Sequence, residues 1–220
     1  MRLCKHIRVV RRKTLEQLES RTLLSSYFVS GSGSDANPGT AAAPWKTLQK
    51  SADSVKAGDT VNVTAGHYAG FSKFGLKGTA AAHIIFRAAA GVNVVSKSGE
   101  TAVDCGIELS GFDASTGSAY VDLYGFNVND ASGNITGAVS SGIRIRFSNN
   151  IGVYNCTAAN NGWVGIYCAY VNNITIDGCT SANNNLFVDS STMRNHGIYI
   201  ANSSSNVTIR DCTVSGNNGW

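Results

Sequence analysis

Long hydrophobic runs, proline and charged residues are all scarce in this sequence. No segment approaches the roughly 20 apolar residues that a membrane-spanning helix needs, so we expect no transmembrane segment. Only 2 of the 220 residues are proline and 15% are charged, whereas 43% are hydrophobic. This composition excludes a disordered or collagen-like chain and favours one domain with a core. Six cysteines in a chain of this length are too dilute for a disulfide framework.

Basic residues are concentrated at the start of the chain. Residues 1–21 contain seven Lys or Arg against two Asp or Glu, and the remainder is almost neutral. A domain that binds nucleic acid carries a basic stripe on its folded surface. We therefore expect no nucleic-acid partner.

The N-terminal segment, residues 1–26, lacks the apolar core of roughly 7–15 residues that defines a secretory signal peptide. Periodicity alone allows a short helix with Leu15 and Leu18 on one side. The stretch Leu15-Glu-Gln-Leu-Glu-Ser-Arg-Thr-Leu-Leu24 resembles a segment found at the start of many large surface or exported bacterial proteins. That resemblance implies a segment that targets the protein for export. It therefore implies a disordered leader over residues 1–26 and an extracellular or cell-surface location.

A strand, a helix and a second strand are predicted over residues 27–63. Residues 27–30 favour a short strand, and turn-forming residues follow. Pro44 suits a first helical turn, and apolar residues then recur at spacings of three and four, at Trp45, Leu48, Ala52 and Val55. Val61 and Val63 alternate with polar neighbours, which predicts a strand.

Three later segments repeat one another. Gly142-Ile-Arg-Ile, Gly165-Ile-Tyr-Cys and Gly197-Ile-Tyr-Ile begin 23 and 32 residues apart, and a second set begins at Asn150, Asn173 and Asn206. A period near 23 with strict apolar alternation is typical of a solenoid of stacked parallel strands. We expect the alternating Ile and Val side chains to point inward, and the extra residues of the third repeat, near 186–194, to form a loop.

The N-terminal module resembles that of the pectate-lyase-like superfamily of right-handed parallel β-helix proteins. The resemblance covers residues 27–68 and rests on Val29-Ser-x-x-Gly-Ser-Asp-x-Asn-Pro-Gly-Thr40, Pro44-x-Lys-Thr-Leu-Gln49 and Ala57-Gly-Asp-Thr-Val61. It implies an all-β, single-stranded, right-handed parallel β-helix over residues 27–220 with an N-terminal capping helix. Because Asn217-Asn-Gly-Trp220 repeats Asn160-Asn-Gly-Trp163 just before a new turn, we expect the β-helix to be truncated at its C-terminus.

Repeated polar and cysteine residues predict ladders between turns. Cys156, Cys179 and Cys212 occupy one inward row, and parallel side-chain vectors on stacked strands suit a disulfide poorly. We expect free, buried thiols. Pairs of Asn recur in the turns, where Asn tolerates a left-handed backbone and can bond its equivalent one turn away. Asp177 and Arg210 predict an ion pair between turns.

One outward row carries the candidate site. Arg144, Tyr167 and Tyr199 share an outward position, Trp163 and His196 lie in the preceding turns, and Asp189 and Arg194 lie in the inserted loop. Aromatic faces stack on sugar rings, and Arg pairs bidentately with carboxylates. Tyr and Arg also simply suit an exposed sheet face, so a structural role stays open.

Polysaccharide lyases of the superfamily remove the proton next to a uronate carboxylate with a Lys or Arg base, while calcium held by clustered aspartates neutralises that carboxylate. Residues 100–220 contain no such Asp cluster, so the catalytic residues and metal ligands stay unassigned, and calcium is implied by resemblance alone. Our leading hypothesis is a monomeric, exported, carbohydrate-active protein that acts on acidic polysaccharide by β-elimination, with glycoside hydrolysis as the other enzymatic reading. The alternative is a non-catalytic surface, adhesive or carbohydrate-binding repeat module.

Overall fold

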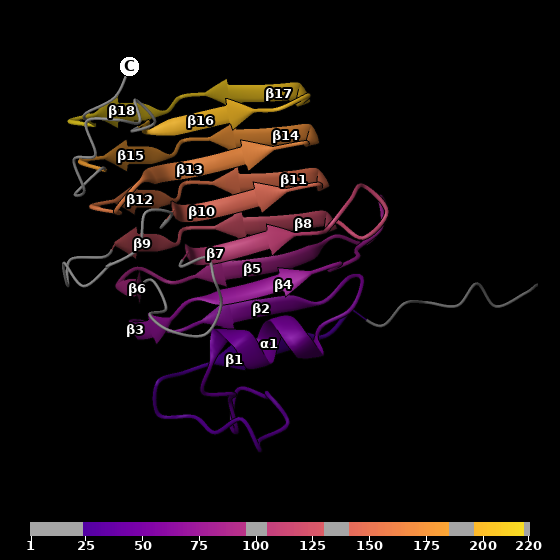
Figure 1. Ribbon diagram of the computed structural model, residues 1–220. Coiled ribbons are helices and arrows are strands. Elements are labelled where there is room, and N and C mark those ends of the chain that lie inside the picture. The colour runs from indigo at the N-terminus through magenta and orange to yellow at the C-terminus, as the bar shows by residue number, and fades with distance from the viewer. Residues whose placement is uncertain (1–23, 96–104, 130–140, 185–195, 218–220) are drawn as a thin grey trace, which may run out of the picture.

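The computed structural model describes residues 24–95, 105–129, 141–184 and 196–217, which wind into a parallel β-helix. Successive turns of the coil place strands in three parallel sheets, here called the front, rear and side sheets after their positions in Figure 1. Most of the predicted leader, residues 1–23, lies outside the described residues. No helix among the described residues is long and apolar enough to cross a membrane.

The strands of each sheet follow one another along the axis of the coil (Figure 1). The rear sheet contains, in spatial order, β1 (Ser26–Val29), β2 (Thr60–Val63), β5 (Ile84–Ala88), β8 (Ala119–Tyr124), β11 (Asn149–Tyr154), β14 (Asn172–Asp177) and β17 (Ser205–Arg210). The front sheet contains β4 (Phe71–Phe74), β7 (Cys105–Ser110), β10 (Ser141–Arg146), β13 (Val164–Ala169) and β16 (Ile198–Ala201). The side sheet contains β3 (Gly66–Ala69), β6 (Val92–Val95), β9 (Asn127–Asn129), β12 (Thr157–Ala159), β15 (Thr180–Ala182) and β18 (Thr213–Ser215).

The two strands predicted for each repeat are confirmed as the front and rear strands. Ile143 of β10 pairs with Ile166 of β13, which in turn pairs with Ile198 of β16. The prediction missed the third strand of each turn, which forms the side sheet. These strands are only three or four residues long, too short to display an alternating pattern.

The core fills the inside of the coil with the alternating apolar side chains, as predicted. Ile143, Ile145, Ile166 and Cys168 of neighbouring front strands are completely buried, and equivalent residues lie beside one another in register. Full burial of a side chain of this size stabilises the fold by about 1.5–3 kcal/mol. Because a single turn cannot bury its own apolar face, this stabilisation arises only from stacked turns.

The capping helix, α1 (Leu48–Ser54), is shorter than predicted. Pro44 does not lie in its first turn; the N-cap is Thr47, whose side chain accepts a hydrogen bond from the Lys50 N–H. Trp45 instead forms a β-bridge with Val29 and stacks on Tyr27 at 4.6 Å between ring centroids. The spacing of Trp45 fits a helix, but a tertiary contact with β1 determines its backbone.

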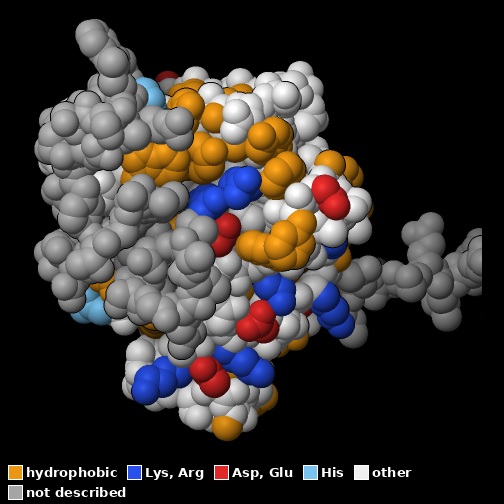
Figure 2. Space-filling model, in the orientation of Figure 1, with side chains coloured by type: hydrophobic (Ala, Val, Ile, Leu, Met, Phe, Trp, Pro, Cys, Tyr) orange, Lys and Arg blue, Asp and Glu red, His pale blue; other side chains and the backbone are white. Residues whose placement is uncertain are grey.

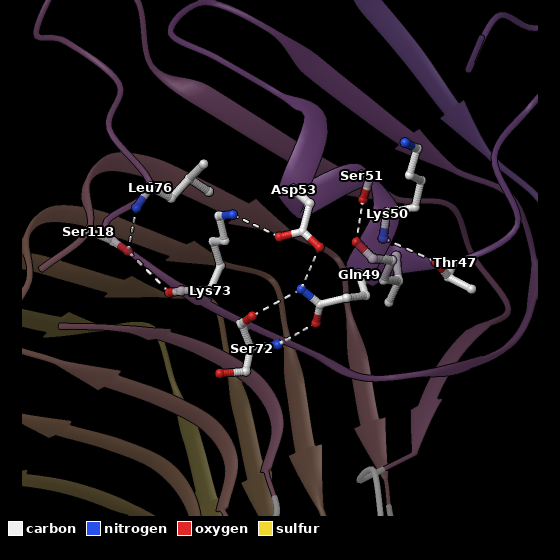
Figure 3. Close-up of polar contacts among 10 residues, drawn as sticks. Thr47, Gln49, Lys50, Ser51, Asp53, Ser72, Lys73, Leu76 and Ser118 are labelled. Carbon is white, nitrogen blue, oxygen red and sulfur yellow. Dashed lines mark hydrogen bonds and ion pairs between the residues drawn. The ribbon is translucent and has the colours of Figure 1, made fainter. Parts of the chain in front are cut away.

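The helix also terminates the front sheet at its edge strand, β4 (Figures 1 and 3). The Gln49 side-chain amide donates to the Ser72 carbonyl at 3.1 Å, and its oxygen accepts from the Ser72 N–H at 3.1 Å. Lys73 of β4 pairs with Asp53 of α1 at 2.7 Å (Figure 3). Gln49 thus supplies the hydrogen bonds that a further strand would make, and it protects an edge that otherwise invites pairing with another chain.

The predicted cysteine ladder is confirmed. Cys156, Cys179 and Cys212 are free thiols on successive turns, and the first two are buried. Burial also raises the pKa of Cys168, on the front sheet, to about 12. The buried cysteines behave as small hydrophobes, whereas Cys212, on the last described turn, is only half-buried.

The predicted asparagine ladders are confirmed as well. Asn161 donates to Asn184 at 2.9 Å, and Asn184 donates to Asn217 at 2.9 Å, with the first two completely or almost completely buried. Asn173 donates to Asn150 on the rear face. Each of these amides bonds to the next, so the ladders tie consecutive turns together, and among the described residues the buried Asn161 Oδ1 is left without a hydrogen bond.

Candidate functional site on the front sheet

One row of outward side chains crosses the whole front sheet. Parallel pairing places Ser72 beside Glu108, Glu108 beside Arg144, Arg144 beside Tyr167 and Tyr167 beside Tyr199. Strand alternation fixes these side chains on the outer face because their neighbours in sequence, such as Ile143 and Ile145, fill the core. The sheet therefore aligns one acidic, one basic and two aromatic side chains along the axis of the coil.

Glu108 is the negative end of this row. Its carboxylate accepts hydrogen bonds from the hydroxyl of Ser72 at 2.7 Å and that of Ser110 at 2.9 Å. Arg144 Nε lies 3.8 Å from Glu108 Oε1, and both side chains are more than nine-tenths buried. The two charges thus face each other at a distance that gives Coulomb attraction but no direct hydrogen bond.

Arg144 is left with unused hydrogen-bonding capacity. Its Nε and Nη1 atoms are buried and make no hydrogen bond in the described part of the chain. The guanidinium carbon lies 5.9 Å from the centre of the Tyr167 ring, within range of a cation–π interaction. A guanidinium with unpaired N–H donors can form charge-assisted hydrogen bonds with a carboxylate.

Aromatic side chains continue the row beyond Arg144. The Trp163 and Tyr167 rings are 5.2 Å apart, Tyr167 and Tyr199 are 5.6 Å apart, and His196 and Tyr199 are 4.6 Å apart, measured between centroids. All three pairs are tilted by about 40° to each other. Figure 2 shows this face, with hydrophobic side chains above adjacent charges of both signs.

A second aromatic pair lies at the same face and is much more exposed. Phe74, outward on β4, and Phe112, just after β7, make an edge-to-face contact with centroids 5.0 Å apart. Their exposed fractions are 42% and 77%. Asp113 rigidifies the turn that carries Phe112 by accepting hydrogen bonds from Ser115 and Thr116, which lower the pKa of this carboxyl to about 2.

The structure brings together five of the residues singled out from the sequence, Arg144, Trp163, Tyr167, His196 and Tyr199. Asp189 and Arg194 lie outside the described residues. The outward register agrees with the sequence pattern, but an outward position is not an exposed one here, because Arg144 is 7% and Tyr167 8% exposed. Glu108, Phe74 and Phe112 are additions that the sequence pattern did not indicate.

The front face does not assemble a metal site from the described residues. Within the described ranges, no group of three or more His, Cys, Asp or Glu side chains converges closely enough to hold a metal ion. Glu108 is occupied by hydroxyl donors and Arg144, whereas a calcium ion needs about 6–8 oxygen ligands. These residues do not fit a calcium site.

Comparison with known families and structures agrees with this architecture. The sequence model of the Pel9A-like right-handed β-helix region matches residues 27–191. No curated protein sequence matches the chain. Similar solved structures include a rhamnogalacturonan lyase (20% identity, TM-score 0.63, covering 86% of this chain and 56% of the other) and an alginate lyase from Paenibacillus sp. (16%, 0.54, 84% and 58%).

A lacto-N-biosidase from Eubacterium ramulus is also similar, at 15% identity and a TM-score of 0.55, covering 86% of this chain and 41% of the enzyme. At these identities the likeness concerns the fold. The chain spans roughly half the length of these solved structures. The predicted right-handed parallel β-helix is therefore confirmed as an architecture that occurs in both lyases and a glycosidase.

Proposed function

This chain belongs to the Pel9A-like right-handed β-helix family, and we propose that it is a carbohydrate-active protein whose front sheet binds an acidic polysaccharide. The observation that carries the proposal is the buried Arg144 guanidinium with two unused N–H groups. Leaving such donors unmade costs about 1–3 kcal/mol each, and a ligand carboxylate that accepts from this guanidinium recovers part of that cost.

The aromatic side chains supply the second part of the binding site. Tyr199 and Trp163 are half-buried and flank Tyr167 next to Arg144. Sugar rings stack on such faces through their C–H surfaces. The exposed Phe74–Phe112 pair extends the apolar surface on the other side of Glu108. A uronate carboxylate on Arg144 with neighbouring sugars on the aromatic faces is the arrangement we propose.

For activity we propose polyuronate lyase-like chemistry. In β-elimination a base removes the proton from the carbon next to the carboxylate, the bond from the β-carbon to the glycosidic oxygen breaks, a C=C bond forms, and the leaving oxygen takes up a proton. Arg144 would neutralise the carboxylate and thereby make that C–H more acidic. The names of the similar solved structures, a rhamnogalacturonan lyase and an alginate lyase, support this class of substrate.

A non-catalytic carbohydrate-binding module is the second candidate. The observation that favours it is the lack, among the residues that the structure describes, of clustered acidic side chains. The two candidates share the Arg144 site and differ only in whether the bound chain is cleaved.

The experiment uses the full-length protein, with polygalacturonate, alginate and rhamnogalacturonan as probes. Binding is measured by affinity electrophoresis and cleavage by the ultraviolet absorbance of unsaturated product, with added calcium and with chelator. Arg144→Met should abolish binding. Arg210→Met is the matched control, because it removes an exposed ion pair with Asp177 on the rear sheet.

The possible results separate the candidates. Binding together with a rise in absorbance supports a lyase, and binding without cleavage supports the non-catalytic carbohydrate-binding module. Equal binding by Arg144→Met and the wild-type protein would overturn the front-sheet site.

We also propose that the protein acts outside the cell. The segment Leu15–Leu24 supports this through its resemblance to the start of exported bacterial proteins, and polysaccharide is an extracellular substrate. Residues 27–220 would then form the β-helix domain behind a leader over residues 1–26. Fractionation of cells that produce the full-length protein, compared with a variant in which Leu15–Leu24 is replaced by Gly and Ser, tests the location.

A further inference from the structure

A hollow of about 280 Å³ lies on the outer surface of the rear sheet, remote from the Arg144 row. Its lining comes from β8, β11 and β14 and from His83, which directly precedes β5. We call it the rear hollow. Its volume is just below the usual range for ligand pockets, about 300–1,000 Å³, which suits one sugar unit of a chain.

A histidine–aspartate pair forms one wall of the rear hollow. His83 Nδ1 lies 2.9 Å from Asp122 Oδ2, and Asp122 is 8% exposed. The Asp122 carboxylate accepts a hydrogen bond from Nδ1–H, which holds the imidazole ring in one orientation. An oriented imidazole beside a carboxylate is suited to hydrogen-bonding the hydroxyl groups of a ligand.

Tyr120 breaks a ladder at the opening of the rear hollow. Asn150, Asn173 and Asn206 occupy its position on the following turns, and all four residues have φ between 52° and 55°. Asn tolerates this left-handed conformation, whereas for a bulky residue it is an outlier. The Tyr120 ring is held edge-on to His83, with centroids 5.4 Å apart. The aromatic side chain is therefore present where local backbone preference favours asparagine.

Gly152 allows Tyr154 and Asp122 to pack closely over the floor of the rear hollow. A Cβ at this position would lie 2.2 Å from the Tyr154 ring and 2.5 Å from Asp122 Oδ1. Tyr154 forms the adjoining wall, and burial, together with the charge of Asp122, raises the pKa of its hydroxyl. Tyr154 therefore remains a protonated hydrogen-bond donor at neutral pH.

We propose that the rear hollow is a second carbohydrate-binding site, selective for a neutral sugar unit, with His83 and Asp122 as the hydrogen-bonding groups and Tyr120 as the stacking face. None of the described residues that line the hollow is Lys or Arg, and Asp122 is its charged group. A uronate carboxylate would meet repulsion there, whereas hydroxyl groups find both donors and acceptors. The site differs in face and in ligand charge from the Arg144 row.

The test follows the imidazole nitrogens of His83 by NMR in the full-length protein. The probes are matched pairs that differ only at carbon 6: glucose and glucuronate, galactose and galacturonate, and mannose and mannuronate. We expect a saturable shift of His83 with at least one neutral sugar, and at least about threefold weaker binding of its uronate partner. The signal of His67, on strand β3 of the side sheet, should not move.

Two variants distinguish a binding role from a structural one. Tyr120→Asn restores the asparagine ladder, so its melting temperature should equal or exceed that of the wild type, while neutral-sugar binding should weaken about threefold to tenfold. Asp122→Asn keeps a hydrogen-bond acceptor for His83 but removes the charge, so the preference for the neutral sugar should disappear.

Three results would overturn the proposal. The first is the absence of a saturable His83 shift with every neutral sugar. The second is tighter binding of a uronate than of its neutral partner at His83 in the wild-type protein. The third is unchanged neutral-sugar binding in Tyr120→Asn. Arg144→Met should leave binding at the rear hollow intact, which separates this outcome from that of the front-sheet site.

Discussion

Replacing Arg144 with methionine distinguishes a ligand-binding residue from a partner in a structural ion pair. Methionine keeps much of the length and apolar stem of arginine but removes the charge and all donors. Removing one partner of a buried structural ion pair lowers the free energy of unfolding by about 3–5 kcal/mol. Replacing a residue that is retained for binding should lower it much less, because the burial of that residue already destabilises the folded protein.

The expected magnitude follows from the geometry of the pair. At the 3.8 Å between Arg144 Nε and Glu108 Oε1, the attraction is about 4 kcal/mol at an effective dielectric constant of about 20. Opposing this attraction, Nε and Nη1 make no hydrogen bond within the described residues. Each unsatisfied buried donor destabilises the folded protein by about 1–3 kcal/mol. The attraction and the penalty nearly cancel. In addition, Glu108 keeps its hydrogen bonds from Ser72 and Ser110 when Arg144 is replaced. We expect Arg144→Met to change the unfolding free energy by less than about 2 kcal/mol in either direction.

Urea unfolding of the full-length protein, followed by circular dichroism, measures this change, and affinity electrophoresis on polygalacturonate measures binding in parallel. Glu108→Gln combined with Arg144→Met completes a double-mutant cycle for the pair. Near-normal stability with lost binding supports the proposed role. A loss above about 3 kcal/mol that the double variant largely restores would refute the reasoning, because Arg144 would then serve mainly to neutralise Glu108.

Three further predictions concern stability and reactivity. Gln49→Leu removes both hydrogen bonds to the Ser72 backbone and should lower the unfolding free energy in urea by about 1–3 kcal/mol; a change below about 0.5 kcal/mol would contradict an edge-capping role. Burial acts to raise the pKa of Asp53, but hydrogen bonds from Lys73 and Gln49 and the charge of Lys73 outweigh it and lower the pKa. The resulting stabilisation is present above the unfolded value of 3.8 and is lost as the pH falls through the lower folded value, so Asp53→Asn should flatten the acid dependence of the melting temperature; an unchanged profile would rule out this contribution. Because burial raises the pKa of Cys168 to about 12, iodoacetamide at about pH 8 should label this thiol only when urea unfolds the protein. Mass spectrometry of the Cys168 peptide measures the labelling, and labelling of the native protein would contradict the prediction.

The repeat predicted most of the fold because each long strand shows its own alternation. Ile143, Ile166 and Ile198 recur at intervals close to one turn and lie side by side in the structure. The side sheet could not be predicted in this way. A strand such as Thr157–Ala159 has only Ala158 pointing inward, and one inward residue has no period. Its position is determined by neighbours above and below rather than by its own sequence.

The candidate site was only partly predictable for a related reason. Alternation determines that Arg144 points outward, but it carries no information on its 7% exposure. Glu108 lies 36 residues before Arg144, well beyond the 23-residue spacing of the regular turns, so their adjacency emerges only from the register of β7 and β10. Irregular early turns thus hide contacts that regular turns reveal.

Departures from self-similarity provide a way to recognise sites in such a coil. Stacked turns are stabilised when like side chains lie on like, as Ile143 does on Ile166 or Asn150 on Asn173. A residue that breaks a row gives up part of that stabilisation. Tyr120 ends an asparagine row while keeping its left-handed backbone, and Arg144 stands where the tyrosine row of the front sheet ends, with buried donors left unpaired. Because each substitution opposes the local stabilisation of the coil, binding is the physical reason that best accounts for both.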